Sequence, residues 1–254
     1  MPEIITFMSP KGGSGATFVC AGVWATLCEK SYKVLAFDAC FEKGALDYAL
    51  GFKSDYVYTM TDVADGNCSL KDAMVSFGSG SFLRADYENN FFETEDAFEI
   101  LNKTDFDYIL VDLNDRNEDF VNEVLKKTHK LILVADPGIL SCKCCEMAVD
   151  KFEFENTFVL VNKIIPTYIK AGVHCTVDDI IDAVSSPLMG LVPWSPGAEI
   201  IMRQGIKNGI CDNELKTTFS NVADRICGVQ KKAYDFRKVY DCFKLGKNFS
   251  VKSD

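Results

Sequence analysis

The feature that most constrains this chain is a glycine-rich run, residues 9–17, between an apolar segment and a long helical pattern. Gly12, Gly13 and Gly15 permit the positive φ angles of a tight loop, in which successive backbone N–H groups face an anion. A helix that begins directly after such a loop adds the favourable field of its N-terminus. The run therefore predicts a phosphate-binding loop, called the phosphate loop below, between the first strand and the first helix.

One position of the phosphate loop departs from the usual pattern. G-x-x-x-x-G-K-[ST] places Lys immediately before its last hydroxyl residue, whereas here Ala16 precedes Thr17. Ser14 and Thr17 remain as hydroxyl residues, and Lys11 stands near the start of the loop. The sequence thus keeps the shape of a nucleotide site and has lost part of its chemistry.

The rest of the chain alternates short apolar runs with helical patterns, which is typical of a mostly parallel sheet covered by helices on both faces. We expect a first helix over residues 17–30, deeply buried because apolar residues cover much of its surface. Residues 78–94 have the least pattern and predict a loop-rich connection. The expected strands are 4–8, 33–37, 108–111, 131–135, 158–161 and 189–192.

The carboxyl ends of these strands carry the candidate binding residues. In an open α/β sheet the ligand crevice lies at those ends, so side chains there are expected to meet in one place. The residues are Ser9, Asp38, Asp112, Asp136, Asn162 and Pro193.

Charge and hydropathy limit the classes of partner. The 254 residues carry a net charge of −10, so nonspecific DNA binding by the whole body is not expected. Residues 225–254 differ, with eight basic and three acidic residues. No run of eighteen apolar residues predicts a transmembrane helix, and the first residues predict a strand rather than a signal peptide. We therefore expect a cytoplasmic protein.

Cysteine usage agrees with that expectation and leaves one alternative open. Eleven cysteines without an export signal predict reduced thiols. Cys142, Cys144 and Cys145 form the densest group, but a metal site needs paired ligands and usually a second cluster. His129 and His174, the two histidines, lie near no cysteine pair in the sequence. Buried or incidental thiols are the simpler interpretation, and a thiol or metal protein is the alternative.

Further motifs follow the phosphate loop in a recognisable order. After PKGGSGAT come VLAFDAC, LDYALG, DVADG, LKDA, FDYILVD, LVNK, LVP and RQG, which end at residue 205. In this order they resemble the MinD/ParA family of P-loop ATPases, whose deviant Walker A loop reads K-G-G-x-G-K-[ST]. The resemblance covers roughly residues 1–210.

The resemblance implies a fold and an assembly. The fold is α/β, a three-layer P-loop NTPase fold with a mostly parallel central sheet of seven or eight strands covered by helices. We expect a single domain over 1–254, with 212–246 as a C-terminal helical segment. Family members bind ATP or ADP with Mg²⁺ and form a homodimer through the nucleotide face.

The resemblance also assigns roles by position. Lys11 would reach the partner's phosphates, and Asn162 and Pro193 would lie on the adenine side. The Mg²⁺ residues would be Thr17, Asp38 and Asp112, and the phosphate cradle would be Gly12, Gly13, Ser14 and Gly15.

Three catalytic parts of the family pattern are altered. The general phosphate lysine is Ala16, and the switch I pattern D-x-D ends in Cys40, a neutral thiol that cannot replace a carboxylate. Switch II has no Gly after Asp112 and instead contains Arg116, a candidate replacement cation. Losing one preorganised electrostatic contact costs ~10²–10³ in rate, so we expect negligible hydrolysis. Nucleotide binding itself is in question because of Ala16.

Two related explanations are disfavoured. A single engineered substitution at Ala16 would leave Cys40 and Arg116 unexplained, so natural loss of function accounts for more of the pattern. The iron–sulfur relative of the superfamily, the nitrogenase iron protein, carries cluster cysteines near switch II, and residues 112–119 contain none.

The C-terminal region has a helical pattern of its own. Apolar residues recur at steps of four and three: Val222, Ile226, Val229, Ala233, Phe236, Tyr240 and Phe243. The pattern predicts a terminal helix docked on the domain. The alternatives are a basic helix that contacts a membrane and a helix that binds a partner.

Two functional readings follow besides the thiol or metal protein. The preferred one is a pseudo-ATPase that acts as a dimeric localisation or assembly adaptor. It would serve a pilus or another membrane-associated machine at the inner face of the cell membrane. Its kind of erosion is similar to that of pilus-localisation factors of the TadZ/CpaE type. The alternative is a slow active ATPase switch in septum positioning or in partitioning of DNA or cargo.

Overall fold

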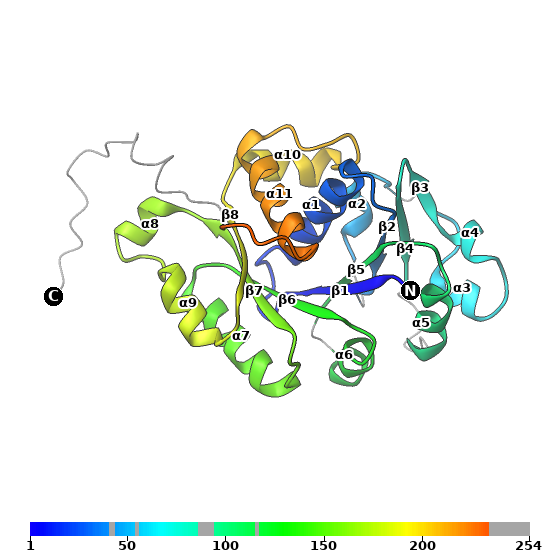
Figure 1. Cartoon of the computed structure of the whole chain (residues 1–254), viewed down its shortest axis with the longest axis horizontal. Helices are drawn as coiled ribbons and strands as arrows, with labels where there is room; N and C mark the ends of the chain where they lie inside the picture. Colours follow the sequence, from blue (N-terminus) through cyan, green and yellow to red (C-terminus); the bar gives the residue numbers. More distant parts are fainter. Residues whose placement is uncertain (41–43, 54–55, 86–93, 115–116, 234–254) are drawn as a thin grey trace.

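The computed structural model of the chain describes residues 1–40, 44–53, 56–85, 94–114 and 117–233. The strands are β1 Glu3–Met8, β2 Val34–Asp38, β3 Val75–Phe77, β4 Gly80–Arg84, β5 Tyr108–Leu113, β6 Lys130–Ala135, β7 Thr157–Ile164 and β8 Leu188–Pro193. They form one eight-stranded sheet in the order β3-β4-β2-β5-β1-β6-β7-β8 (Figure 1). Only β3, at one edge, runs antiparallel to its neighbour. The predicted α/β fold with a mostly parallel sheet is confirmed.

Helices cover both faces of this sheet. They are α1 Ala16–Glu29, α2 Leu46–Leu50, α3 Met60–Ala64, α4 Leu70–Ala73, α5 Thr94–Asn102, α6 Glu118–Leu125, α7 Ile139–Phe152, α8 Pro166–Lys170, α9 Val177–Val184, α10 Pro196–Gln204 and α11 Asn213–Ile226. One apolar core lies between the sheet and α1, α2, α10 and α11, and a second lies under α3 to α7 and α9 (Figure 1). The arrangement is three-layered, as expected.

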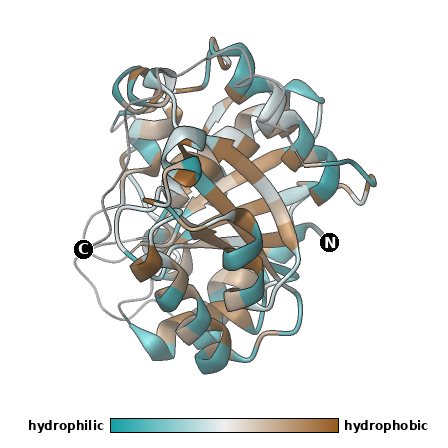
Figure 2. Ribbon diagram, turned by 90° about the vertical axis from the view of Figure 1, so that its left-hand side faces the viewer, coloured by the Kyte–Doolittle hydropathy of each residue, from teal (hydrophilic) through white to brown (hydrophobic). Residues whose placement is uncertain are grey.

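The strands are buried on both sides, which explains their unbroken apolar sequences. In β1, Ile5 and Phe7 belong to one core while Ile4 and Met8 belong to the other, because successive side chains point to opposite faces. Figure 2 shows mostly hydrophobic strands in the centre, surrounded by helices that mix hydrophilic and hydrophobic residues. A fully covered parallel sheet places polar chemistry at strand ends, where the candidate site lies.

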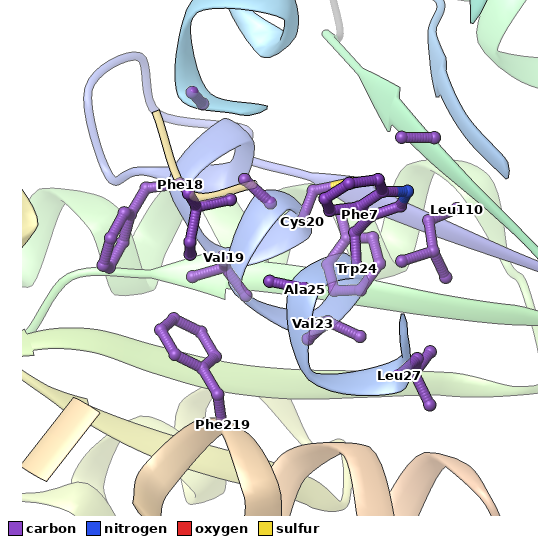
Figure 3. Packing of buried hydrophobic residues seen from close by; sticks show 14 of the residues in the cluster. Phe7, Phe18, Val19, Cys20, Val23, Trp24, Ala25, Leu27, Leu110 and Phe219 are labelled. Carbon is purple, nitrogen blue, oxygen red and sulfur yellow. The ribbon is translucent and has the colours of Figure 1, made fainter. Parts of the chain in front are cut away.

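Helix α1 lies deep in the first core, as the sequence predicts. Phe219 of α11 points toward it, and the rings of Phe18 and Phe219 meet edge to face with centroids 5.5 Å apart (Figure 3). A Cβ atom at Gly22 would lie 2.3 Å from Phe219 Cζ, so the close approach of the two helices requires glycine there. The phosphate loop therefore leads into a rigidly held helix.

The prediction of a loop over residues 78–94 is wrong for Gly80–Arg84, which forms the buried strand β4 beside β2. Trp24 of α1 covers this strand, and its indole N–H donates to the carbonyl of Ser81 over 3.2 Å. The sequence of β4 has no β-branched residue, so tertiary burial rather than local preference makes it a strand. Residues 86–93 lie outside the described part of the chain.

The continuous helix predicted through Val229 and Ala233 is also wrong in the part that can be compared. Helix α11 ends at Ile226, and Gly228 has a φ of 80°, the left-handed conformation that ends helices. Val229 is exposed. The expected segment 212–246 continues beyond residue 233 into residues that the structure does not describe. Within the described residues, no helix has the length and apolar character to cross a membrane.

Candidate nucleotide-binding site

A cavity of about 730 Å³ opens at the carboxyl ends of the central strands. Its size is that of a small-molecule site, for which volumes of roughly 300–1,000 Å³ are typical. Residues of the phosphate loop, of the ends of β5, β7 and β8, and of α10 line it. Among them are Ser9, Gly12, Gly13, Gly15, Ala16, Thr17, Cys40, Asp112, Asn114, Asn162, Lys163, Pro193, Trp194, Ser195 and Glu199.

The phosphate loop keeps its shape without a lysine at position 16. Gly15 has a φ of 96° and directly precedes α1, which begins at Ala16. The buried Asn162 donates from Nδ2 to the carbonyl of Ser14 over 2.8 Å. A Cβ atom at Gly15 would lie 2.4 Å from that nitrogen, so glycine is required by both the backbone angle and the contact. Strand β7 thus holds the loop through Asn162.

A second contact holds the start of the loop. Lys11 Nζ lies 2.8 Å from Asp136 Oδ2, and the hydroxyl of Ser14 donates to the same oxygen over 2.9 Å. Burial of Asp136 acts against ionisation, but the hydrogen bonds from Lys11 and Ser14 outweigh it and lower the pKa of this carboxyl. Lys11, expected to reach a partner, is paired within its own chain in this structure. Ser14, expected in the cradle, uses its side chain to support the loop.

Lys163 brings a cation to the phosphate loop that the sequence analysis did not single out. Its Nζ donates to the carbonyl of Gly13 over 2.6 Å, and its backbone adopts a φ of 58° at the end of β7. Of the described residues that line the cavity, Lys163 alone is a lysine or arginine. Its place in the motif LVNK, directly after Asn162, was the available signal.

Asp38, Cys40 and Asp112 form a carboxylate–thiol cluster at the ends of β2 and β5. One ligand atom from each lies within 4.8 Å of the others, and both carboxylates are 1% exposed. The backbone N–H of Cys40 donates to Asp38 Oδ1 over 3.2 Å, and its thiol donates to the carbonyl of Asp112 over 3.5 Å. Asp112 Oδ2 is buried and receives no hydrogen bond from the described residues.

Burial dominates the protonation of this cluster. It raises the pKa of Asp112 to about 7, with the charge of Asp38 acting in the same direction, while hydrogen bonds from Thr17 and Cys40 oppose it. Burial likewise raises the pKa of Asp38 to about 6, and Arg84 opposes it. Burial and both carboxylates raise the pKa of the Cys40 thiol well above its usual value.

Arg84 is a second functional candidate absent from the sequence analysis. It lies at the end of β4, opposite Asp38 in the register of the sheet. Its guanidinium lies 3.6 Å from Asp47 Oδ2 and donates to the hydroxyl of Tyr56. Because the sequence predicted a loop over residues 78–94, it offered no reason to place this arginine beside Asp38.

The remaining expected residues fall as follows. Thr17 and Pro193 line the cavity, and Ala16 is buried at the start of α1. Arg116 lies outside the described residues. Cys142 and Cys145 of α7 are buried and belong to no group of three metal-ligating side chains within the described part of the chain.

The donor set can be compared with the needs of Mg²⁺, which prefers oxygen ligands. Thr17, Asp38 and Asp112 offer oxygens, and the buried Asp112 Oδ2 without a donor is suited to a cation. These residues fit Mg²⁺. The sulfur of Cys40 in the same cluster does not.

Comparisons with known proteins agree with this geometry. No family model matches the chain. The septum site-determining protein MinD of Helicobacter pylori is 23% identical, covering 93% of this chain and 95% of the relative. MinD of Synechocystis is 26% identical, covering 95% of each chain.

Solved structures give the same result. A chain of the MinC:MinD cell division protein complex of Aquifex aeolicus superposes with a TM-score of 0.81 at 25% identity, covering 92% of this chain and 98% of that one. MinD of Pyrococcus horikoshii, complexed with Mg-ADP, has a TM-score of 0.73 at 23% identity over 89% and 96% of the two chains, and shares the fold.

The sheet order, the glycine loop before α1 and the strand-end crevice define a P-loop NTPase fold. In sequence and in fold, the relatives above support placing the chain with the MinD/ParA P-loop ATPases, to which it is similar over nearly its whole length.

Proposed function

We propose that this chain binds ADP or ATP with Mg²⁺, hydrolyses ATP at a negligible rate, and acts as a dimeric localisation or assembly adaptor. The observation that carries the proposal is a phosphate loop whose geometry is intact although its lysine is Ala16. A backbone cradle needs no side chain to face an anion, and α1 contributes the field of its N-terminus.

Lys163 is the residue we assign to the lost charge. Its ammonium group already contacts the carbonyl of Gly13, on the loop that would surround the phosphates. A hydrogen bond that involves a charged group contributes about 1.5–3 kcal/mol, enough to offset part of the loss at position 16. Lys163 approaches from β7 rather than from α1, so it would bind phosphate without the position that the family lysine has for catalysis.

The same site supports binding better than turnover. Thr17, Asp38 and Asp112 would hold Mg²⁺, which when bound neutralises phosphate charge. Cys40 stands where the family pattern has a carboxylate, and its thiol stays protonated because burial raises its pKa. A protonated thiol is a poor acceptor for a proton from attacking water. Hydrolysis is therefore the part of the family activity that we expect to be lost.

The adaptor role rests on the retained Lys11 and on relatives that assemble. One similar structure is the MinC:MinD complex, in which a family member meets a protein partner. In this chain Lys11 is paired with Asp136, and a dimer through the nucleotide face would require it to leave that partner. We propose a membrane-associated machine such as a pilus as the place of action, by similarity to eroded family members of the TadZ/CpaE type.

A second candidate is a slow ATPase switch in septum positioning. The specific observation in its favour is that the relatives from Helicobacter pylori and Synechocystis are both named septum site-determining protein MinD. The two candidates differ in turnover, since a switch of this kind must hydrolyse ATP.

Calorimetry and a turnover assay separate these candidates. Binding of Mg-ADP and Mg-ATP is measured for the unaltered chain, for Lys163→Met, and for Lys71→Met, which removes an exposed lysine of α4 remote from the cavity lining. We expect the unaltered chain and Lys71→Met to bind alike, and Lys163→Met to bind roughly tenfold to a hundredfold more weakly. ATP turnover above a buffer blank would contradict the pseudo-ATPase. Absence of binding by every variant would contradict the whole proposal.

A further inference from the structure

We infer that the carboxylate–thiol cluster of Asp38, Cys40 and Asp112 binds a borderline-soft divalent cation, Zn²⁺ or Co²⁺, in preference to Mg²⁺. The cluster adjoins the proposed nucleotide site and so refines its metal, but the inference needs no nucleotide. It concerns the sulfur that Cys40 adds to the ligand atoms of the cluster, at a position where the family pattern has a carboxylate.

The three ligand atoms are already close enough for one ion. They lie within 4.8 Å of one another. Metal–sulfur bonds of about 2.3 Å and metal–oxygen bonds of about 2.0–2.2 Å place neighbouring donors roughly 3.3–3.8 Å apart in a tetrahedral site. Small side-chain rotations therefore suffice, and the backbone N–H of Cys40 on Asp38 holds two of the three residues together.

A second observation points to a cation at the same place. The Asp112 side chain is 1% exposed, and its Oδ2 receives no hydrogen bond from the described residues. A buried acceptor without a partner is destabilising, and more so if it is charged. Among the described residues that line the cavity, Lys163 alone is a lysine or arginine, and it contacts Gly13 on the phosphate loop. A bound cation would supply the missing partner of Asp112 Oδ2.

The identity of the ion follows from the ligand types. Mg²⁺ is a hard ion that keeps oxygen ligands and several waters, whereas thiolate ligands select Zn²⁺ and similar ions. Two carboxylates and one thiolate carry three negative charges, which suit a divalent ion in a buried site. A fourth ligand position would remain open toward the cavity, beside Thr17.

Binding has a proton balance that can be measured. The ion displaces to solvent the proton of the Cys40 thiol and any proton held by the carboxyls of Asp38 and Asp112, while the freed sulfur and oxygen lone pairs form the metal bonds. No electron is transferred and no co-reactant is required.

The test uses the full reduced chain, purified without oxygen and free of nucleotide. Co²⁺ is added and the near-ultraviolet charge-transfer absorption of a cobalt–thiolate bond is recorded, followed by displacement with Zn²⁺ and then with Mg²⁺. We expect the absorption to saturate at one Co²⁺ per chain. It should disappear when Zn²⁺ is added and remain when Mg²⁺ is added at the same concentration. Cys40→Ser should abolish the absorption and weaken Zn²⁺ binding by at least about tenfold. Cys211→Ser, which changes an exposed cysteine outside the cluster, should retain it.

Cys40→Asp sharpens the comparison, because an all-oxygen cluster should gain Mg²⁺ or Mn²⁺ binding while it loses the absorption. X-ray absorption at the zinc edge of the unaltered chain needs no variant, and should show one sulfur neighbour at about 2.3 Å. An absorption that persists in Cys40→Ser, a zinc site without sulfur, or equal competition by Mg²⁺ would overturn the inference. If Mg-ADP binds but no cobalt–thiolate signal appears, the inference fails and the proposed function stands. If the signal appears but no nucleotide binds, the proposed function fails and the inference stands.

Discussion

The phosphate loop and the carboxylate–thiol cluster adjoin the same cavity, and each departs from the family pattern at one position, Ala16 and Cys40. The loop keeps its conformation, because glycine φ angles and the contacts of Asn162 and Asp136 define it. The cluster keeps the carboxyl groups of Asp38 and Asp112, and burial raises the pKa of both. The conformation of the loop is thus set by backbone angles and neighbouring contacts, whereas the protonation of the cluster is set by burial and by the charges of its members.

The largest effect is expected from breaking the loop at Gly15. Gly15→Ala places a methyl group on a residue with a left-handed backbone conformation and presses it against Asn162 Nδ2. We expect the free energy of unfolding to fall by roughly 2–6 kcal/mol unless the loop changes its conformation. Nucleotide binding should disappear. Calorimetry and chemical denaturation measure both. For stability the matched control is Gly12→Ala, where a Cβ atom would meet nothing within 4 Å, and an equal loss of unfolding free energy in both variants would contradict the role of Asn162.

The carboxylate–thiol cluster should make the stability of the chain depend on pH. The pKa values of Asp112 and Asp38 in the folded chain, about 7 and about 6, exceed their unfolded values near 4. The folded chain therefore binds more protons between roughly pH 4 and pH 7, and its stability falls as the pH rises through that window. Without metal, we expect a loss of roughly 2–4 kcal/mol between pH 5 and pH 8 in chemical denaturation.

Asp112→Asn is the control for this pH dependence. It removes one titrating carboxyl and should flatten the curve, leaving the smaller contribution of Asp38, which Arg84 partly offsets. An unchanged slope in this variant would show that other groups carry the effect.

Restoring the loop lysine should have a smaller effect. Ala16→Lys supplies a cation at the family position, and we expect Mg-ADP affinity to rise by about 1.5–3 kcal/mol. Lys163→Met should matter less in that background than alone, because the two lysines would share the same phosphates. Equal losses of affinity for Lys163→Met in both backgrounds, measured by calorimetry, would show that the two lysines act independently and do not share the same phosphates.

The smallest effect concerns the pair between Lys11 and Asp136. The pair is partly exposed, so Asp136→Asn should cost no more than about 1 kcal/mol in unfolding free energy. It should also free Lys11 and increase the dimeric fraction with nucleotide, which sedimentation measures. Glu146→Gln, which breaks the exposed pair with Lys143, is the control. A dimeric fraction that falls only in Asp136→Asn would indicate that the carboxylate itself supports assembly.

The strand ends were the best predicted part of the molecule. Asp38, Asp112 and Asn162 were expected just beyond or at the ends of apolar runs, and they lie in the last residues of β2, β5 and β7. Such runs have one stable environment, a sheet covered on both faces, so their position follows from local pattern. Strand β4 had no such pattern, and Arg84 was missed with it.

Sequence alone determined that the chain has a phosphate loop before a buried helix, that its lysine is absent, and that carboxylates and one thiol follow the strands. Those features are local, since glycine positions and apolar periods act over a few residues. Only the tertiary structure decided that Lys163 reaches Gly13, that Lys11 pairs with Asp136, and that Cys40 lies between two buried carboxylates. These contacts join residues up to 150 positions apart, and sheet order rather than chain order brings them together.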